Sequence, residues 1–184
     1  MLFGVEPNRF LVAEVEDLPP GRALDVACGA GRNAVWLASR GWTVTGVDFS
    51  DVALENARAL AVSRRVDVEW VRADVREWQP PAGAFDLVAV LYLQLPAAER
   101  DAILRGAAAG LAAGGTLLIV GHDLQNLNGG HGGPKDPAVL FTPDDVVAAL
   151  DGLEIERAER VLRPVDTEDG EAQAIDALVR ARRP

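Results

Sequence analysis

The chain is poor in cysteine and lysine, and both shortages exclude kinds of chemistry. Cys28 is the only cysteine, so no disulfide can form within the chain and no cluster of thiolates can hold a metal. His122, Asp123 and His131 carry atoms that can ligate a metal, but nothing in their spacing fixes a coordination geometry, and we expect no metal site. A chain without internal disulfides suits a reducing compartment, and we expect a cytoplasmic location.

Lys135 is the only lysine, and 18 basic residues face 28 acidic ones, which gives a formal net charge of −10. A field of this sign repels the phosphates of nucleic acids and anionic membrane surfaces. No stretch approaches the roughly 18 consecutive apolar residues of a membrane-spanning helix. The N-terminus also lacks the basic and then apolar segments of a secretory signal. We therefore expect a small molecule as partner, and neither nucleic acid nor a membrane.

A length of 184 residues is enough for one α/β domain and too short for two ordinary ones, so we interpret residues 1–184 as a single domain. Short β-branched apolar runs alternate with helical stretches rich in alanine and arginine. This pattern predicts strands at 22–27, 43–47, 66–71, 85–90 and 116–120, and helices at 7–18, 31–40, 50–63 and 96–113. Two final strands, at 153–165 and 172–182 with a turn at 166–170, have no helix between them and indicate a hairpin.

Residues 121–140 hold five glycines and two prolines without periodicity, which predicts a long loop. A further helix then begins, with Thr142 as N-cap and Pro143 at the first helical position, and ends near residue 150. The whole pattern predicts an α/β, Rossmann-like, doubly wound fold with a mostly parallel seven-stranded sheet and an antiparallel edge hairpin. Ligands of such sheets bind beyond the carboxyl ends of the strands, near the switch in strand order.

A glycine-rich loop joins the first strand to the next helix, in the sequence LDVACGAGRN of residues 24–33. Gly29 and Gly31 permit positive φ angles and a close approach of backbone to a ligand. The pattern also fits a dinucleotide-binding fold. Asp25 is more specific, because its carboxylate can accept hydrogen bonds from the ammonium group of a bound amino-acid moiety and would repel a pyrophosphate. The alternative is a carboxylate satisfied by nearby backbone N–H groups.

Acidic residues also end the second and third predicted strands. Asp48 can bind both hydroxyls of a ribose, and Phe49 beside it can stack on the base; the alternative is a turn in which Ser50 caps the next helix. Asp74 can accept a hydrogen bond from the exocyclic amine of adenine, or it is an ordinary loop residue. Asp86 begins the fourth strand, and we interpret it as structural.

The order of these motifs, followed by LAAGGTLLI at residues 111–119, resembles that of class I S-adenosylmethionine-dependent methyltransferases, and the resemblance covers nearly the whole chain. The segment GRNAVWLA at residues 31–38 is similar to small-molecule methyltransferases of the tellurite-resistance group. The resemblance implies S-adenosylmethionine as cofactor and a small-molecule methyl acceptor. The cofactor-binding residues that it implies are Asp25, Ala27, Cys28, Gly29, Gly31, Arg32, Asn33, Asp48, Phe49, Ser50, Ala73, Asp74, Val75, Val90 and Leu91.

The chain departs from that family in two places. Ala27 stands where the family usually has its first glycine, and we expect it to be tolerated through a negative φ angle. Related chains often begin with an extra aromatic and acidic segment that closes over the cofactor. Here the sequence starts shortly before Glu6, so we expect that lid to be truncated or missing.

Residues near the acceptor are expected after the fourth and fifth strands, and the candidates are Tyr92, Gln94, His122, Asp123 and His131. His122 follows the fifth strand directly, and a histidine there can act as a base near neutral pH, so it is the predicted catalytic residue. A base helps only when the acceptor must lose its proton early. The alternative for His122 is a polar loop residue bonded to backbone, and His131, among glycines, is interpreted as incidental.

Two other classes of protein stay open at this point. An NAD(P)-dependent oxidoreductase uses a similar glycine turn, although Asp25 and the later motifs argue against it. A non-catalytic module that binds S-adenosylmethionine is the other. The fold does not name the acceptor, so metalloid oxyanions, thiols, halides and hydroxylated metabolites all stay open. We expect a monomer or a homodimer.

Overall fold

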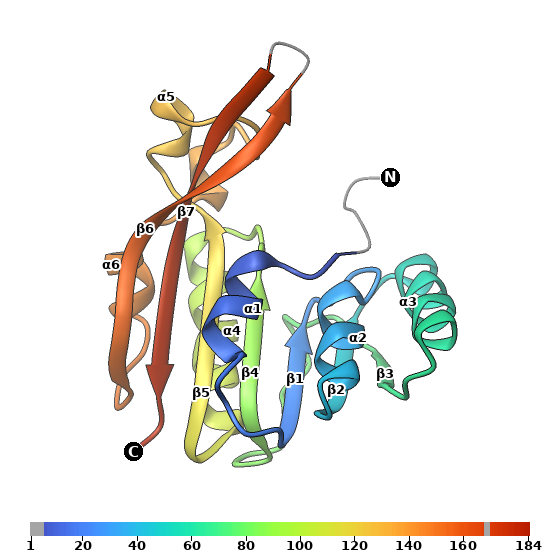
Figure 1. The fold of residues 1–184 in the computed structure, drawn as a ribbon. Coiled ribbons are helices and arrows are strands. Elements are labelled where there is room, and N and C mark those ends of the chain that lie inside the picture. Colours follow the sequence, from blue (N-terminus) through green and yellow to red (C-terminus); the bar gives the residue numbers. More distant parts are fainter. Residues whose placement is uncertain (1–5, 168–169) are drawn as a thin grey trace.

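The structure, a computed structural model, describes residues 6–167 and 170–184 and contains one seven-stranded sheet with the order β3-β2-β1-β4-β5-β7-β6 (Figure 1). The strands are β1 (Arg22–Val26), β2 (Thr43–Asp48), β3 (Glu69–Arg72), β4 (Phe85–Leu91), β5 (Leu111–His122), β6 (Glu154–Thr167) and β7 (Gly170–Arg182). Strands β1 to β5 are parallel, and β7 pairs antiparallel with both β5 and β6. The predicted fold class is therefore confirmed.

Helices cover both faces of this sheet (Figure 1). They are α1 (Arg9–Val15), α2 (Arg32–Ser39), α3 (Asp51–Arg64), α4 (Ala97–Gly110), α5 (Asn126–Gly129) and α6 (Pro143–Val147), with a 3₁₀ turn at Pro137–Val139. Within the described residues, no helix is both long and apolar enough to span a membrane. Most boundaries lie within two or three residues of the expected ones, which is the usual scatter at the ends of elements.

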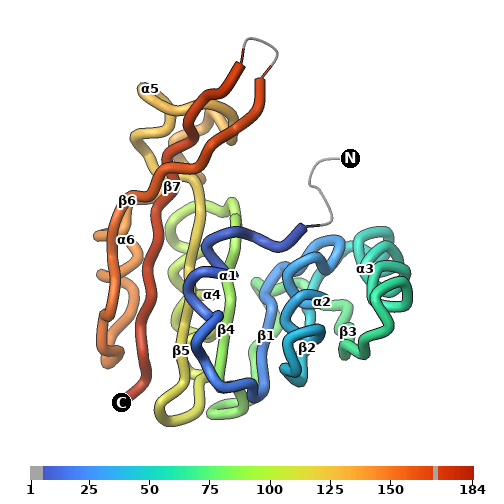
Figure 2. Tube along the Cα trace, in the orientation of Figure 1, coloured from blue at the N-terminus to red at the C-terminus, as the bar shows by residue number. Residues whose placement is uncertain are grey.

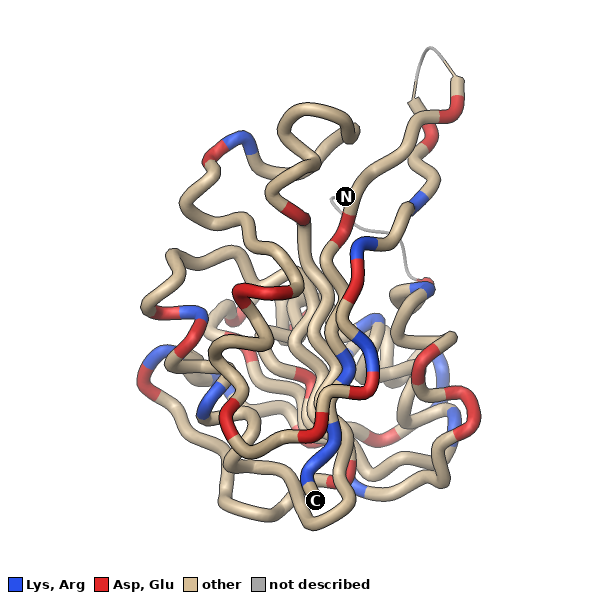
Figure 3. The backbone as a smooth tube through the Cα atoms, turned by 90° about the vertical axis from the view of Figure 1, so that its left-hand side faces the viewer, with Lys and Arg blue, Asp and Glu red and all other residues tan. Residues whose placement is uncertain are grey.

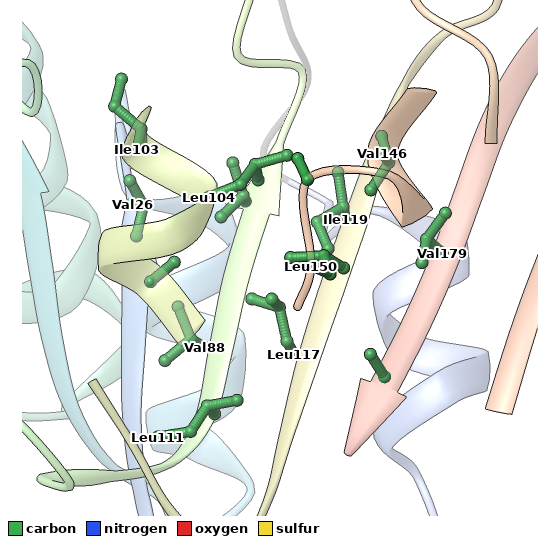
Figure 4. Packing of buried hydrophobic residues seen from close by; sticks show 14 of the residues in the cluster. Val26, Val88, Ile103, Leu104, Leu111, Leu117, Ile119, Val146, Leu150 and Val179 are labelled. Carbon is green, nitrogen blue, oxygen red and sulfur yellow. The ribbon is translucent and has the colours of Figure 1, made fainter. Parts of the chain in front are cut away.

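The core forms two layers because successive side chains of a strand point to opposite faces. In β5, Leu117 and Ile119 pack under α4 and α6, and Figure 4 shows them with Val146 of α6 and Leu104 of α4. Leu118 and Val120 face the other way and pack with residues of α1 and α2. A strand buried on both faces reads as a continuous apolar run, which explains why residues 116–120 were predicted as a strand. The strand itself is longer, because it begins at Leu111 and ends at His122.

The prediction of a long loop at residues 121–140 is wrong in part. Gly121 and His122 belong to β5, and the remainder contains α5 and the 3₁₀ turn. The segment also binds β7: the Oδ1 of Asn126 accepts the N–H of Ile175 at 2.8 Å, and the N–H of His131 donates to the carbonyl of Gln173 at 2.8 Å. Its order therefore comes from a strand far along the chain, which leaves no periodic signal in the segment itself.

The closing hairpin is longer than expected, and its far end projects beyond the carboxyl end of β4 (Figure 2). β6 extends two residues into the expected turn at 166–170, and β7 begins at Gly170, two residues before its expected start at 172. Residues 168–169 of that turn lie outside the described part of the chain. Residues at the base of the hairpin pair β7 with β5, while β6 forms the sheet edge. The hairpin thus places β7 side chains beside the end of β5.

Candidate cofactor and acceptor site

The glycine-rich loop leads from the carboxyl end of β1 into α2, at the point where the strand order reverses between β1 and β4. The N–H of Cys28 donates to the carbonyl of Val47 at 2.9 Å, which ties the loop to β2. Ala27 has a φ of 55° and Gly29 the same value, so the expected negative φ at Ala27 is wrong. The tight turn requires this left-handed backbone, which costs an L-residue such as alanine about 1–2 kcal/mol.

The two loop glycines have different surroundings. A Cβ atom on Gly31 would lie 2.6 Å from the Trp70 ring and 2.7 Å from the Cβ of Ala57, so Gly31 allows α2 to pack closely on α3 and β3. A Cβ on Gly29 would meet no other described atom within 4 Å. Gly29 therefore presents its backbone to open space. The neighbouring Cys28 is buried, and burial raises the pKa of its thiol, so it stays protonated.

Asp48 lies at the end of β2 and binds the loop from the opposite side. Its Oδ2 accepts the N–H of Gly29 at 2.8 Å, and its Oδ1 accepts the N–H of Ser50 at 2.9 Å. A carboxylate has about four acceptor positions, so both oxygens can still accept a hydrogen bond from a ligand. The Ser50 side chain caps α3 through the N–H of Ala53, as expected. Asp48 thus fixes the loop and keeps capacity for a pair of hydroxyl groups.

Phe49, which follows Asp48, is 70% exposed, an unusual state for an aromatic side chain beside a buried carboxylate. The carbonyl of Asp48 accepts the N–H of Ala73 at 3.1 Å, so the end of β3 lies next to the end of β2. The Arg76 Nη2 donates to the Oδ2 of Asp74 at 2.6 Å, and this contact holds the pKa of the Asp74 carboxyl well below its ordinary value. Val75 is half-buried and packs on the core. An adenine amine at Asp74 would therefore share its carboxylate with Arg76.

Asp25 lies near the carboxyl end of β1 and is only 1% exposed. Its Oδ2 accepts the N–H of Ala34 at 3.1 Å, so the alternative of backbone satisfaction holds for one oxygen. Burial raises its pKa from 3.8 to about 7, against the lowering effects of the Ala34 N–H and the Arg32 charge. A cation beside this carboxylate would relieve the cost of its burial, which is the property that an ammonium site requires.

Arg32 and Asn33, at the start of α2, form hydrogen bonds with the N-terminal segment. The Oδ1 of Asn33 accepts the N–H of Asn8 at 2.8 Å, and Asn8 in turn caps α1. Arg32 donates to the carbonyl of Glu6 at 3.2 Å. The chain therefore enters the fold beside the glycine-rich loop. The expectation of a truncated or missing lid concerns residues 1–5, which lie outside the described residues.

The end of β4 lies beside that of β1, on the side away from β2. Val90 and Leu91 are buried on opposite faces of the sheet. Tyr92 follows with a φ of 56°, and its N–H donates to the carbonyl of Val120 at 2.7 Å. A tyrosine in left-handed backbone is unfavourable, and such residues gather at ligand sites.

His122 lies at the carboxyl end of β5, as expected, although it belongs to the strand itself rather than to the loop predicted at 121–140, and its side chain is 10% exposed. Its Nδ1 lies 3.2 Å from the Oδ1 of Asp176 on β7, out of line for a hydrogen bond, and its ring centroid lies 5.0 Å from that of Tyr92. The Tyr92 hydroxyl donates to the Oδ2 of Asp176 at 2.8 Å. Arg163 donates from Nε to that same Oδ2 at 2.7 Å.

The other candidates near the acceptor do not join this cluster. Asp123 is fully buried, and its Oδ1 accepts Arg160 at 2.9 Å and the N–H of Gln125 at 2.8 Å. Gln94 and His131 are exposed. The Oδ2 of Asp86 accepts the N–H of Arg22 at 2.8 Å, which agrees with the interpretation of Asp86 as a structural residue. Among the described residues, no group of three His, Cys, Asp or Glu side chains is arranged to hold a metal ion.

Sequence reasoning missed Asp176 and Arg163, both from the closing hairpin. Asp176 interrupts the apolar run of residues 174–179, and an acid at the centre of a buried strand is a signal that could have been used. Arg163 stands in an edge strand rich in charged residues, which gives no such signal.

Residues 23–115 match a family described as a methyltransferase domain. The match covers half of the chain, so the chain belongs to this methyltransferase family. The family implies S-adenosylmethionine as cofactor. The open backbone of Gly29, the buried carboxyl of Asp25 and the unused acceptor positions of Asp48 are compatible with that molecule.

Individual relatives agree with this assignment. The chain is 35% identical over 116 residues to trans-aconitate 2-methyltransferase of Rhizobium meliloti (strain 1021), covering 61% of this chain and 43% of that protein. It is 33% identical over 122 residues to a ubiquinone biosynthesis O-methyltransferase of Idiomarina loihiensis, covering 64% and 50% respectively. The chain thus spans half or less of the length of the curated relatives it matches.

Solved structures share the fold. TehB from Haemophilus influenzae gives a TM-score of 0.77 at 17% identity, covering 96% of this chain and 62% of that one. An S-adenosylmethionine-dependent methyltransferase from Methanosarcina mazei gives 0.74 at 19% identity, covering 97% and 98%. At these identities the likeness concerns the fold alone.

Proposed function

We propose that this chain transfers a methyl group from S-adenosylmethionine to a small-molecule acceptor by direct in-line displacement. The observation that carries the proposal is the carboxyl end of the sheet at the strand switch, where Asp48 binds the glycine-rich loop and keeps acceptor positions that its two backbone hydrogen bonds leave unused. When bound, the cofactor supplies an activated methyl group. The protein's part is to align the acceptor with that group and to exclude water.

The site residues take the following roles in this proposal. Asp25 accepts hydrogen bonds from the ammonium group, and Asp48 accepts them from the ribose hydroxyls. Phe49, Ala73, Asp74 and Val75 surround the adenine, while Ala27, Gly29 and Gly31 shape the backbone that faces the methionine part. Cys28, Arg32, Asn33, Ser50, Val90 and Leu91 support these groups. The exposure of Phe49 supports its place, because a bound adenine would cover that ring.

We propose that the acceptor lies beyond the ends of β4 and β5, with His122 as the base. Acidic and basic residues alternate over much of the backbone (Figure 3), and the net charge of −10 favours a small molecule over nucleic acid. Relatives named for trans-aconitate and for ubiquinone biosynthesis support an organic acceptor. The fold of TehB keeps the tellurite-resistance group among the candidates without singling it out. We further propose that residues 1–184 act as one domain, monomeric or dimeric, in the reducing cytoplasm that a single cysteine suits.

Calorimetric titration with S-adenosylmethionine, S-adenosylhomocysteine and NADH in parallel tests the cofactor. Both adenosyl ligands are expected to bind in the micromolar range, and NADH is not. Asp48→Asn should weaken that binding by roughly 10–100-fold, because hydrogen bonds to a charged group contribute about 1.5–3 kcal/mol. Asp67→Asn, a change of the same charge at an exposed position, is the matched control and should bind normally.

The possible results separate the alternatives. Binding of NADH without the adenosyl ligands would favour an oxidoreductase. Binding of none of the three would overturn the proposal. Binding of both adenosyl ligands would justify a screen of protic, thiol and halide acceptors for methyl transfer, which distinguishes an enzyme from a module that only binds the cofactor.

A further inference from the structure

A buried carboxylate, Asp176, lies at the centre of the proposed acceptor side. It is 0% exposed, and three side chains converge on it, from Tyr92 just after β4, His122 of β5 and Arg163 of β6. The Tyr92 hydroxyl and the Arg163 Nε reach its Oδ2 at 2.8 and 2.7 Å, and His122 lies 3.2 Å from its Oδ1. These contacts keep the pKa of Asp176 below its ordinary value in spite of burial, so the group is a fixed negative charge.

The sheet register, rather than a loop, brings Asp176 to His122. The two residues are direct partners in the antiparallel pairing of β5 with β7, and directly opposed side chains lie on the same face. That face is the one on which Leu118 and Leu178 pack with α1 and α2. The cluster therefore lies on the face of the sheet that is covered by α2, the helix that follows the glycine-rich loop.

The arrangement distinguishes the two nitrogens of His122. Nδ1 is buried and has no aligned hydrogen-bond partner among the described residues, and buried polar nitrogens are rarely left unpaired. The acceptor beside it is the Asp176 carboxylate, so Nδ1 is the nitrogen that gains from carrying a proton. A neutral imidazole with its proton on Nδ1 has a free electron pair on Nε2.

Tyr92 is a poorer base than His122 in the same cluster. Burial, together with the Asp176 charge, raises the pKa of its phenol, so the hydroxyl stays protonated and donates to Asp176. Arg163 balances the charge of Asp176 and donates to the Tyr92 oxygen at 3.0 Å as well. With Tyr92 and Arg163 both acting as donors, His122 is the group of this cluster that can take up a proton.

We propose that Asp176 is a positioning residue that holds His122 in its Nδ1–H form, so that Nε2 accepts the proton of a hydroxyl or amine acceptor. The inference rests on the proposed methyl-transfer function and narrows its acceptor to a protic nucleophile. The acceptor atom forms a bond to the methyl carbon while the carbon–sulfur bond breaks, and that electron pair stays on sulfur in S-adenosylhomocysteine. The acceptor proton moves to Nε2, which leaves an imidazolium whose Nδ1–H faces Asp176.

The test is a nitrogen-15 NMR measurement of the histidine tautomers, which needs no acceptor. The chain has only two histidines, and the exposed His131 serves as an internal reference. His131→Ala assigns the two signals. We expect the neutral His122 ring to show a protonated Nδ1 and an unprotonated Nε2. In Asp176→Asn this preference should relax toward the Nε2–H form, whereas the exposed Asp151→Asn should leave it unchanged.

The outcomes decide the proposal independently of the cofactor. A neutral His122 with its proton on Nε2 in the wild-type protein overturns it, even if Asp176→Asn does not fold. An unchanged tautomer in a folded Asp176→Asn also overturns it. Tyr92→Phe, which keeps the carboxylate and removes one of its donors, should retain the Nδ1–H form. Titration of the same samples with S-adenosylmethionine reports separately on the proposed function. The Kd of Asp176→Asn for S-adenosylmethionine should lie within about twofold of the wild-type value, a difference of roughly 0.4 kcal/mol in binding free energy.

Discussion

Replacing Asp25 with asparagine tests whether burial of this carboxyl group makes its charged form unfavourable. Asp25 is 1% exposed, and burial raises its pKa from 3.8 to about 7. Asparagine has nearly the same shape without a charge, and its side-chain oxygen can still accept the N–H of Ala34. The substitution therefore removes the buried charge and little else.

The pKa shift of Asp25 sets the size and sign of the effect. A carboxyl group whose pKa is raised on folding binds more protons in the folded state than in the unfolded state, so stability falls as pH rises from the unfolded toward the folded value. For values of 3.8 and about 7, the loss between pH 5 and pH 8 is roughly 2–3 kcal/mol. Asp25→Asn lacks this loss, so its stability relative to wild type should increase by that amount over the same interval.

Urea unfolding at the two pH values measures the difference in free energy of unfolding, with Asp67→Asn as the exposed control. The reasoning would be refuted if the free energies of unfolding of Asp25→Asn and wild type differed by the same amount at pH 5 and at pH 8. In that case no buried charge would form on Asp25 between the two pH values. The same variant should bind S-adenosylmethionine more weakly at pH 8, since the ammonium group loses its opposite charge. Greater stability together with weaker binding is the expected combination.

Two further predictions concern local backbone geometry, and urea unfolding checks both. Ala27→Gly should raise the free energy of unfolding by up to about 1 kcal/mol, because the φ of 55° is unfavourable for alanine and the greater freedom of glycine in the unfolded chain offsets part of the gain. Ala30→Gly, outside the left-handed region, should not stabilise, and equal effects at both positions would contradict the argument. Thr142→Ala should lower stability by about 1 kcal/mol, because Thr142 and Asp145 form a capping box at the start of α6. A loss no larger than that of Asp151→Ala, beyond the helix, would count against it.

Features that depend on near neighbours in the chain were predictable from the sequence. Ser50 and Thr142 were identified as caps, because a cap bonds a backbone group only a few residues ahead. The buried parallel strands were found from apolar runs that need no knowledge of the partner strand. The turn chemistry at Ala27 was misjudged, because sequence alone does not reveal whether a loop needs φ above zero at a given residue.

Features that join distant parts of the chain were missed. Asp176 and Tyr92 are 84 residues apart, and their contact depends on two strand pairings that no local pattern encodes. The segment 121–140 is irregular in sequence, yet Asn126 binds Ile175, 49 residues away. Where a segment takes its order from a remote strand edge, composition alone indicates a loop.

The pairing of His122 with Asp176 has a consequence for how the protein tolerates change. Because strand side chains alternate with a period of two, a slip of β7 by one residue would place Ile175 or Ala177 opposite His122 and turn Asp176 to the other face. Insertions in the connecting segments leave this register intact, whereas a single inserted residue within β7 breaks it. Libraries that seek new acceptors should therefore vary the sequence between β5 and α6 and keep the length of β7 constant.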